Sequence, residues 1–193
     1  MVKTALSLVA GGLGVAGCTT AVTPTTTQAT STASDKRRRE QIDVGIDTTL
    51  ARLNTAVPDA RELVSKASGV LVFPSVITAG FVIGGQYGDG ALRVHNATAG
   101  YYNLASLSVG LQIGAQSKAI AFLFMTPDAL DKFRKSEGWV VGADASVAVL
   151  RVGANGRIDS TSVSGPVLAF VLTNAGLMAN LTLEGTKIIR LKI

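Results

Sequence analysis

The chain has 193 residues, of which 47% are hydrophobic and 16% are charged, and its formal net charge is +5. One cysteine and one histidine exclude an intrachain disulfide and leave a Cys/His zinc site short of ligands, so we expect no metal and no cofactor. The mild positive charge without interleaved aromatic residues does not indicate nucleic-acid binding. Beyond the N-terminal segment no apolar run is long enough to predict a bundle of membrane-spanning helices.

The N-terminus has the order of features that defines a signal peptide. A positive start at Lys3 precedes an apolar stretch of small residues, and Val15-Ala16-Gly17-Cys18 follows. This string resembles a bacterial lipobox, which implies removal of residues 1–17 and attachment of diacylglyceryl and palmitate-type chains to Cys18. Because Thr19 follows rather than Asp, the sorting pattern implies the outer membrane, with the domain facing the periplasm. The alternative is an ordinary signal peptide with a chance cysteine.

A tether and two helices are expected next. Half of residues 19–34 are threonine, so residues 18–34 are predicted to form a lipidated, flexible tether before one domain over 35–193. A helix from Asp35 to Leu53 begins with a basic turn and carries one apolar stripe. That stripe consists of Ile42, Ile46, Leu50 and Leu53. After Val57-Pro58, a second short helix is expected to begin at Asp59 and to end at Gly69.

From Gly69 onward the hydrophobic period changes to that of strands. We expect strands near 70–73, 76–85, 91–95, 100–104, 107–114, 118–125, 139–150, 163–173, 177–184 and 186–192. A helix near 126–136 interrupts them, with Thr126 as N-cap and Pro127 in its first turn. Asn155-Gly156 predicts a hairpin turn. The predicted class is α+β, mainly β: a Gly-rich antiparallel sheet that closes towards a barrel or sandwich, with N-terminal helices.

An ordered set of motifs carries a family resemblance. The set runs through Ala67-Ser68-Gly69-Val70-Leu71-Val72-Phe73-Pro74, Ala79-Gly80-Phe81, Gly84-Gly85, Ser108-Val109-Gly110-Leu111-Gln112-Ile113-Gly114, Gly142-Ala143-Asp144, Ala175-Gly176-Leu177 and Leu183-Glu184-Gly185. Over residues 40–193 the chain resembles the SYLF domain, a lipid-binding family of bacterial secreted proteins and of eukaryotic actin and membrane-traffic regulators. Ser68 stands where the family often has Lys, and Tyr101-Tyr102 stand near a common Trp.

The polar residues do not form a recognisable catalytic set. The glycine run Gly84–Gly90 is interpreted as a tight hairpin, because a phosphate-binding glycine loop would precede a helix. His95 is expected at a strand end in a structural or surface role. Asp144 is expected within a strand, bonded to backbone or to Ser146. No nucleophile motif accompanies them, so we expect no catalytic residues and no enzymatic activity.

The predicted lipid-binding residues are Lys36, Arg37, Arg38 and Arg39. Four cations at a helix start oppose the helix dipole, and beside a bilayer they would meet anionic phospholipids. The alternative is a solvated helix start. The lipobox-like string implies a membrane-anchored lipoprotein, and the SYLF resemblance implies that it binds membrane lipids. The rival hypothesis is a cell-envelope structural or assembly protein that binds another protein.

Overall fold

The computed structural model describes residues 25–80, 83–109, 114–150, 157–158, 163, 165–173, 176–177 and 183–193. Its elements in chain order are α1 (Thr25–Ala56), α2 (Ala60–Lys66), β1 (Gly69–Gly80), β2 (Ile83–Val94), β3 (Ala97–Val109), β4 (Gly114–Phe124), α3 (Pro127–Lys135), β5 (Trp139–Val140), β6 (Val147–Val149), β7 (Val167–Thr173), β8 (Gly176–Leu177) and β9 (Lys187–Arg190). The predicted signal peptide, Cys18 and the Asn155-Gly156 turn lie outside the described residues.

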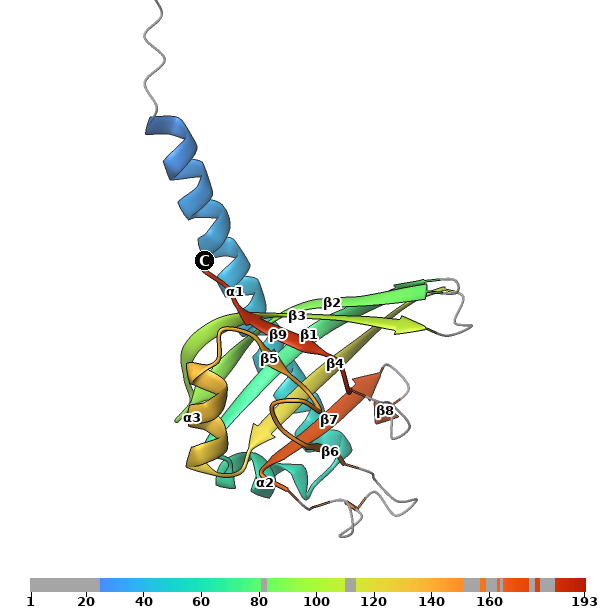
Figure 1. Cartoon of the computed structure of the whole chain (residues 1–193). Coiled ribbons are helices and arrows are strands. Elements are labelled where there is room, and N and C mark those ends of the chain that lie inside the picture. Colours follow the sequence, from blue (N-terminus) through green and yellow to red (C-terminus); the bar gives the residue numbers. More distant parts are fainter. Residues whose placement is uncertain are drawn as a thin grey trace, which may run out of the picture.

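The strands form one sheet that curls into a half-barrel (Figure 1). Its order is β5-β9-β3-β2-β1-β4-β7-β6, with β8 paired to β7. Among the strand pairs of the described residues only β6 and β7 run parallel. The predicted fold class, a mainly antiparallel sheet closing towards a barrel with N-terminal helices, is therefore confirmed.

Strand alternation gives the sheet two apolar faces, each covered by different elements. On one face, aromatic side chains of β1 and β4 pack under α3 and β5, with ring centroids 4.8 Å apart for Phe124 and Phe133 and 5.5 Å apart for Phe133 and Trp139. On the other face, Val70 and Val72 pack against α1 and α2. Two-sided burial explains the continuous apolar runs in β1, β4 and β7.

Helix α1 lies across the second face on the predicted apolar stripe. Ile42, Ile46 and Leu53 are buried, and Leu50 is partly buried. Gly45 brings the helix close to the sheet, since an added Cβ there would lie 2.8 Å from the Pro74 Cγ. The stripe predicted from the sequence is therefore confirmed.

The start of α1 was predicted wrongly. The helix begins at Thr25 rather than at Asp35, and its first turns run away from the sheet (Figure 1). Residues 25–34, expected to be part of the tether, are helical in the structure. Threonine has a modest helix propensity, but adding a residue to a helix already nucleated by packing costs far less than starting one.

Strand β1 runs through Pro74 without a break, which corrects the expected pair of strands. The register with β2 and β4 shifts between Val72 and Val76, so Phe73-Pro74 forms a bulge, where a residue without an N–H is tolerated. The glycine run Gly84–Gly90 lies inside β2 and is not a hairpin. The β2–β3 turn lies at His95 and Asn96, whose φ angles are +50° and +63°.

The later elements agree in part with the sequence. In α3 the Thr126 hydroxyl oxygen accepts a hydrogen bond from the Ala129 amide at 3.2 Å, which confirms the predicted cap. The strand expected over 139–150 is present only at its two ends, as β5 and β6, because a turn with Gly142 at φ +90° separates them. Asp144 lies in that turn and is exposed rather than in a strand.

Candidate functional site

The predicted basic run lies on α1, and the helical period separates its four side chains. Lys36 is exposed, at 3.9 Å from the Glu40 carboxylate, and Arg37 is exposed as well. Arg38 and Arg39 are half-buried against the domain. The structure therefore leaves two of the four cations open to a surface ligand and turns the other two towards the sheet.

Arg38 braces α1 against β2. Its Nε and Nη2 both donate to the Asp89 Oδ2, at 2.8 Å and 2.6 Å, and the Asn103 amide donates to the other oxygen at 3.1 Å. The hydrogen bond to Asp89 is the main reason that the pKa of Arg38 is raised. A half-buried pair of this kind is costly to break from one side, because the remaining charge keeps its desolvation cost.

A second polar brace joins α1 to β2 and β3. The Asp43 carboxylate accepts from the Thr98 hydroxyl at 3.0 Å and from the Tyr101 hydroxyl at 2.8 Å, and it lies 3.3 Å from the Arg93 Nη2. Burial and then the bond to Asp43 raise the pKa of Tyr101. Tyr101 therefore helps to orient α1 through its bond to Asp43. Tyr102 instead packs in the core, with its ring centroid 4.9 Å from that of Phe133. In SYLF sequences a Trp is common near these two positions.

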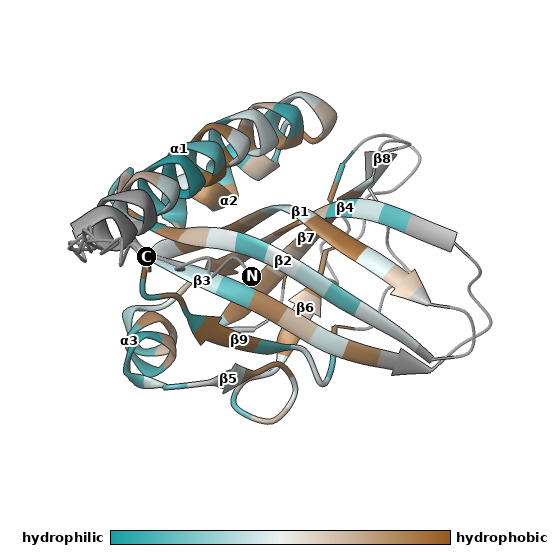
Figure 2. Ribbon diagram, turned by 90° about the horizontal axis from the view of Figure 1, so that it is seen from above, coloured by the Kyte–Doolittle hydropathy of each residue, from teal (hydrophilic) through white to brown (hydrophobic). Residues whose placement is uncertain are grey.

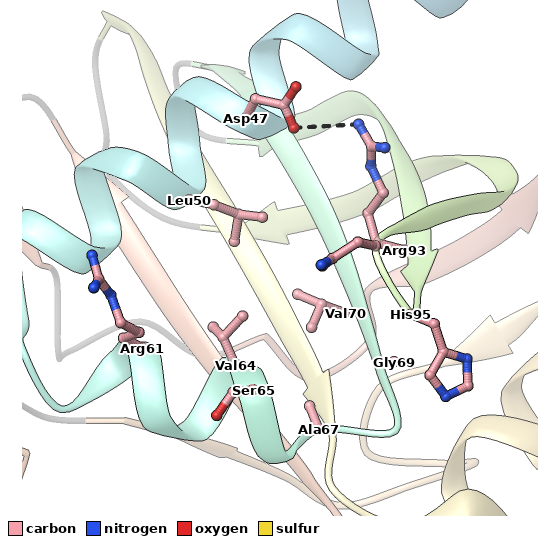
Figure 3. A pocket seen from close by; sticks show the side chains of 11 residues that line it. Asp47, Leu50, Arg61, Val64, Ser65, Ala67, Gly69, Val70, Arg93 and His95 are labelled. Atoms are coloured by element: carbon pink, nitrogen blue, oxygen red, sulfur yellow. Dashed lines mark hydrogen bonds and ion pairs between the residues drawn. The ribbon is translucent and has the colours of Figure 1, made fainter.

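A pocket of about 480 Å³ opens beside this brace, between α1, α2 and the β2–β3 turn (Figure 3). Its polar lining includes Arg61 from α2, Arg93 and His95 from the β2–β3 hairpin, and Asp47 from α1. Its apolar lining includes Leu50, Val64, Ala67 and Val70. Cationic groups around an apolar floor can bind an anionic amphiphile, with the charged head at the arginines and the chain on the floor.

Arg93 is a cation of the pocket that two carboxylates hold in place. Its Nη2 lies 3.3 Å from Asp43 and 3.4 Å from Asp47, which fixes the guanidinium. Its Nε is buried and has no hydrogen-bond partner within the described residues. An unsatisfied buried donor costs free energy, so an acceptor from a ligand would be stabilised there. Arg61 and His95 are exposed, and no ion pair of either is found in the part of the chain that the structure describes.

Sequence reasoning did not identify this pocket, although one of its signals was present. Ala67, Gly69 and Val70 belong to the first family motif, and they line the pocket wall. Arg61 and Arg93 are far apart in the sequence, and only the packing of α2 beside the β2–β3 turn brings them to one hollow. A single sequence gives no reason to place these two arginines close together.

The residues considered for chemistry do not gather. His95 lies on the pocket rim at a strand end, as expected. The Asp144 Oδ2 accepts a hydrogen bond from the Val140 amide at 2.6 Å, a role in the turn. Among the residues that the structure describes, no three His, Cys, Asp or Glu side chains lie close enough to hold a metal ion.

Lys118 of β4 is a buried cation on the α3 side of the sheet. It is 8% exposed, and no carboxylate pairs with it within the described residues. Burial lowers its pKa from the ordinary 10.5. The folded chain therefore releases this proton at lower pH than the unfolded chain does, so Lys118 destabilises the fold most when it is charged.

Lys118→Met is expected to raise the free energy of unfolding, and the gain is expected to shrink as the pH rises towards 10.5, the ordinary pKa. Between the lowered and the ordinary pKa the unfolded parent binds more protons, so the parent gains stability with pH. Both proteins keep Tyr101 and Tyr102, whose raised pKa values act in the opposite direction above pH 10. Urea titrations at several pH values measure the difference, and a gain independent of pH would contradict the assignment.

Residues 105–192 match the family model described as Ysc84, Las17-binding protein actin regulator, which confirms the SYLF resemblance over that segment. This segment holds the last part of β3, from Ala105 to Val109, and every later described element, whereas α1, α2 and the pocket lie before it. No curated protein matches the chain. No helix of the described residues is both long and apolar enough to cross a membrane.

Proposed function

We propose that this chain, whose residues 105–192 belong to the Ysc84 (SYLF) family, is a non-enzymatic module that binds membrane lipids through anionic phospholipid head groups. The family match carries the proposal, because the family is known for lipid binding and actin regulation. The pocket lined by Arg61, Arg93 and His95 supports it, since it offers cations above an apolar floor.

The exposed start of α1 is the second lipid contact in this proposal. Lys36 and Arg37 are open to solvent, and they follow the segment that links the domain to Cys18. A lipidated Cys18 would hold these cations close to the bilayer surface, where each contributes about 1 kcal/mol. The same anchor would place the protein in a bacterial outer membrane, with the domain in the periplasm.

Lys36→Gln/Arg37→Gln is expected to weaken binding to anionic vesicles about tenfold or more at low salt, since two surface cations together contribute about 2 kcal/mol. The measurement is flotation of the mature chain, from residue 18 on and with Cys18→Ser, with vesicles of phosphatidylcholine alone or with added phosphatidylglycerol. Binding should fall with salt as the screening length shortens. Arg38 is left in place, because its loss would leave Asp89 unpaired.

Arg134→Gln/Lys135→Gln is the matched control, because it removes the same two charges from the exposed end of α3. It should bind as the parent does. Arg61→Gln, made separately, reports on the pocket and should also weaken binding. Parent binding that ignores lipid charge, or equal losses in both double variants, would contradict a localised head-group contact.

The second candidate function is binding to another protein of the cell envelope. The matched family is described by a protein partner, Las17, and this favours a protein-binding role for part of the surface. This alternative would be supported if the parent chain did not float with vesicles of any composition but cross-linked to one envelope protein.

A further inference from the structure

The far ends of β1, β2 and β3 form an apolar groove. Ile77 and Tyr87 are each 53% exposed, and Leu107 is 86% exposed. Ile77 pairs with Tyr87, Tyr87 pairs with Ala105, and Gly85 pairs with Leu107, so these side chains share one face of the sheet. The groove encloses about 710 Å³. Exposed apolar side chains in such a group mark an interaction surface.

Helix α1 covers the same face of the sheet, at the opposite ends of these strands. Val70 and Val72 of β1 are buried under the helices, and the bulge at Phe73-Pro74 keeps Ile77 on their side of the sheet. Figure 2 shows hydrophobic segments of β1 and β3 continuing past α1 towards the far ends of these strands. The Arg38 Nη2 donates to the Tyr87 hydroxyl at 3.4 Å, so the groove begins beside the basic start of α1.

The charge of the groove selects its occupant. Its lining includes Lys187 of β9, which is exposed and paired in register with Ala105, and none of the described residues that line it is acidic. The nearest carboxylate on β2, Asp89, is paired with Arg38. A tyrosine and a lysine beside aliphatic side chains are typical of surfaces that enter the boundary between lipid head groups and acyl chains.

We propose that this groove, centred on Ile77, Tyr87 and Leu107, inserts into the outer boundary of an anionic bilayer while Lys187 contacts the head groups. The inference rests on the proposed lipid-binding function and adds an apolar contact to it. Because the groove and the basic start of α1 lie on the same side of the sheet, one bilayer surface can meet both.

The first test places an environment-sensitive fluorophore at Leu107→Cys in the mature chain with Cys18→Ser, so that the probe has a single thiol. With phosphatidylcholine–phosphatidylglycerol vesicles the emission should shift to the blue, and a quencher on the acyl chains should quench it. The same probe at Asp131→Cys, on the exposed side of α3, should change little. Flotation without a shift at residue 107 would overturn the insertion and leave the proposed function intact; no flotation would contradict both.

A second test does not depend on the probe. Ile77→Thr/Leu107→Thr places a β-branched residue, which strands favour, at each exposed strand position, so the fold should persist. Flotation should weaken at least tenfold, as expected when two aliphatic side chains lose their burial. Val163→Thr makes a similar change at another exposed aliphatic residue and should bind as the parent does. Parent-like flotation of the double variant would overturn the proposal. If the parent is a dimer and this variant is a monomer that floats equally well, the groove is a contact between two copies of the chain instead.

Discussion

Gly90→Ala is expected to destabilise the domain by about 3 kcal/mol or more, because an alanine Cβ has no room in the sheet. The new atom would overlap the Val72 carbonyl oxygen and would lie 2.6 Å from the Phe73 Cδ1. Val72 directly precedes the bulge of β1 and Phe73 is part of it, and Phe73 is fully buried. Neither can yield without disturbing the pairing of β1 with β2 or the core beneath it.

Gly85→Ala is the matched control on the same strand. Among the described residues its Cβ would meet only the Ser106 carbonyl oxygen, at 3.9 Å, an ordinary contact. Alanine in a strand restricts the unfolded chain more than glycine does, so this variant should be neutral or slightly stabilised. Urea unfolding of both variants measures the difference. Equal stability of Gly90→Ala and the parent would mean that Val72 and Phe73 do not lie as close to Gly90 as the structure shows.

The glycine run illustrates where sequence reasoning reached its limit. Glycine both forms turns and permits close packing of backbones, and a single sequence does not distinguish the two uses. The decisive fact is the close approach of β1 around its bulge, where Val72 and Phe73 lie against Gly90, and Ser75 and Val76 lie against Gly88. The signal for the true turn was weaker, since His95-Asn96 has no glycine.

Features of the helices could be predicted from neighbouring residues, whereas the pairing of the strands could not. The apolar stripe of α1 and the Thr126 cap of α3 each depend on residues within a few positions, and both are confirmed. The sheet order was not predictable, because β3 pairs with β9 and β4 pairs with β7 across long stretches of chain. Turn chemistry constrains hairpins only, and such distant pairs depend on the whole fold.

The candidate site was predictable only in its general character. The sequence predicted a basic surface at the start of α1. It did not distinguish the half-buried Arg38 and Arg39 from the exposed Lys36 and Arg37. Asp89 on β2 turns Arg38 inward, and Asp43 on α1 organises Arg93 and Tyr101. Each of these pairs joins residues about fifty positions apart. Their partners follow from the packing of α1 on the sheet, which periodicity alone does not specify.

Cys18→Ser is expected to release the protein from the membrane fraction or to leave the precursor uncut, the largest functional change that we predict. The reason is the energy of acyl chains in a bilayer, about 0.8 kcal/mol for each buried CH₂ group. One acyl chain gives marginal and reversible binding, whereas two or three anchor a protein almost permanently. By comparison, two surface cations contribute only about 2 kcal/mol, which orients an anchored protein but does not hold one.

The anchor is measured by fractionation of cells together with the intact mass of the membrane-bound protein. The parent should begin at Cys18 and carry the added mass of diacylglyceryl and acyl groups. Thr19→Asp is the matched variant, since it keeps the lipidated cysteine and changes only the residue that the sorting pattern reads; it should remain lipidated but leave the outer membrane. An unmodified Cys18 in membrane-bound parent protein would refute the anchor. The domain would then have to hold the membrane through its cations and apolar groove alone, and high salt should release it because the cationic part of that contact is screened.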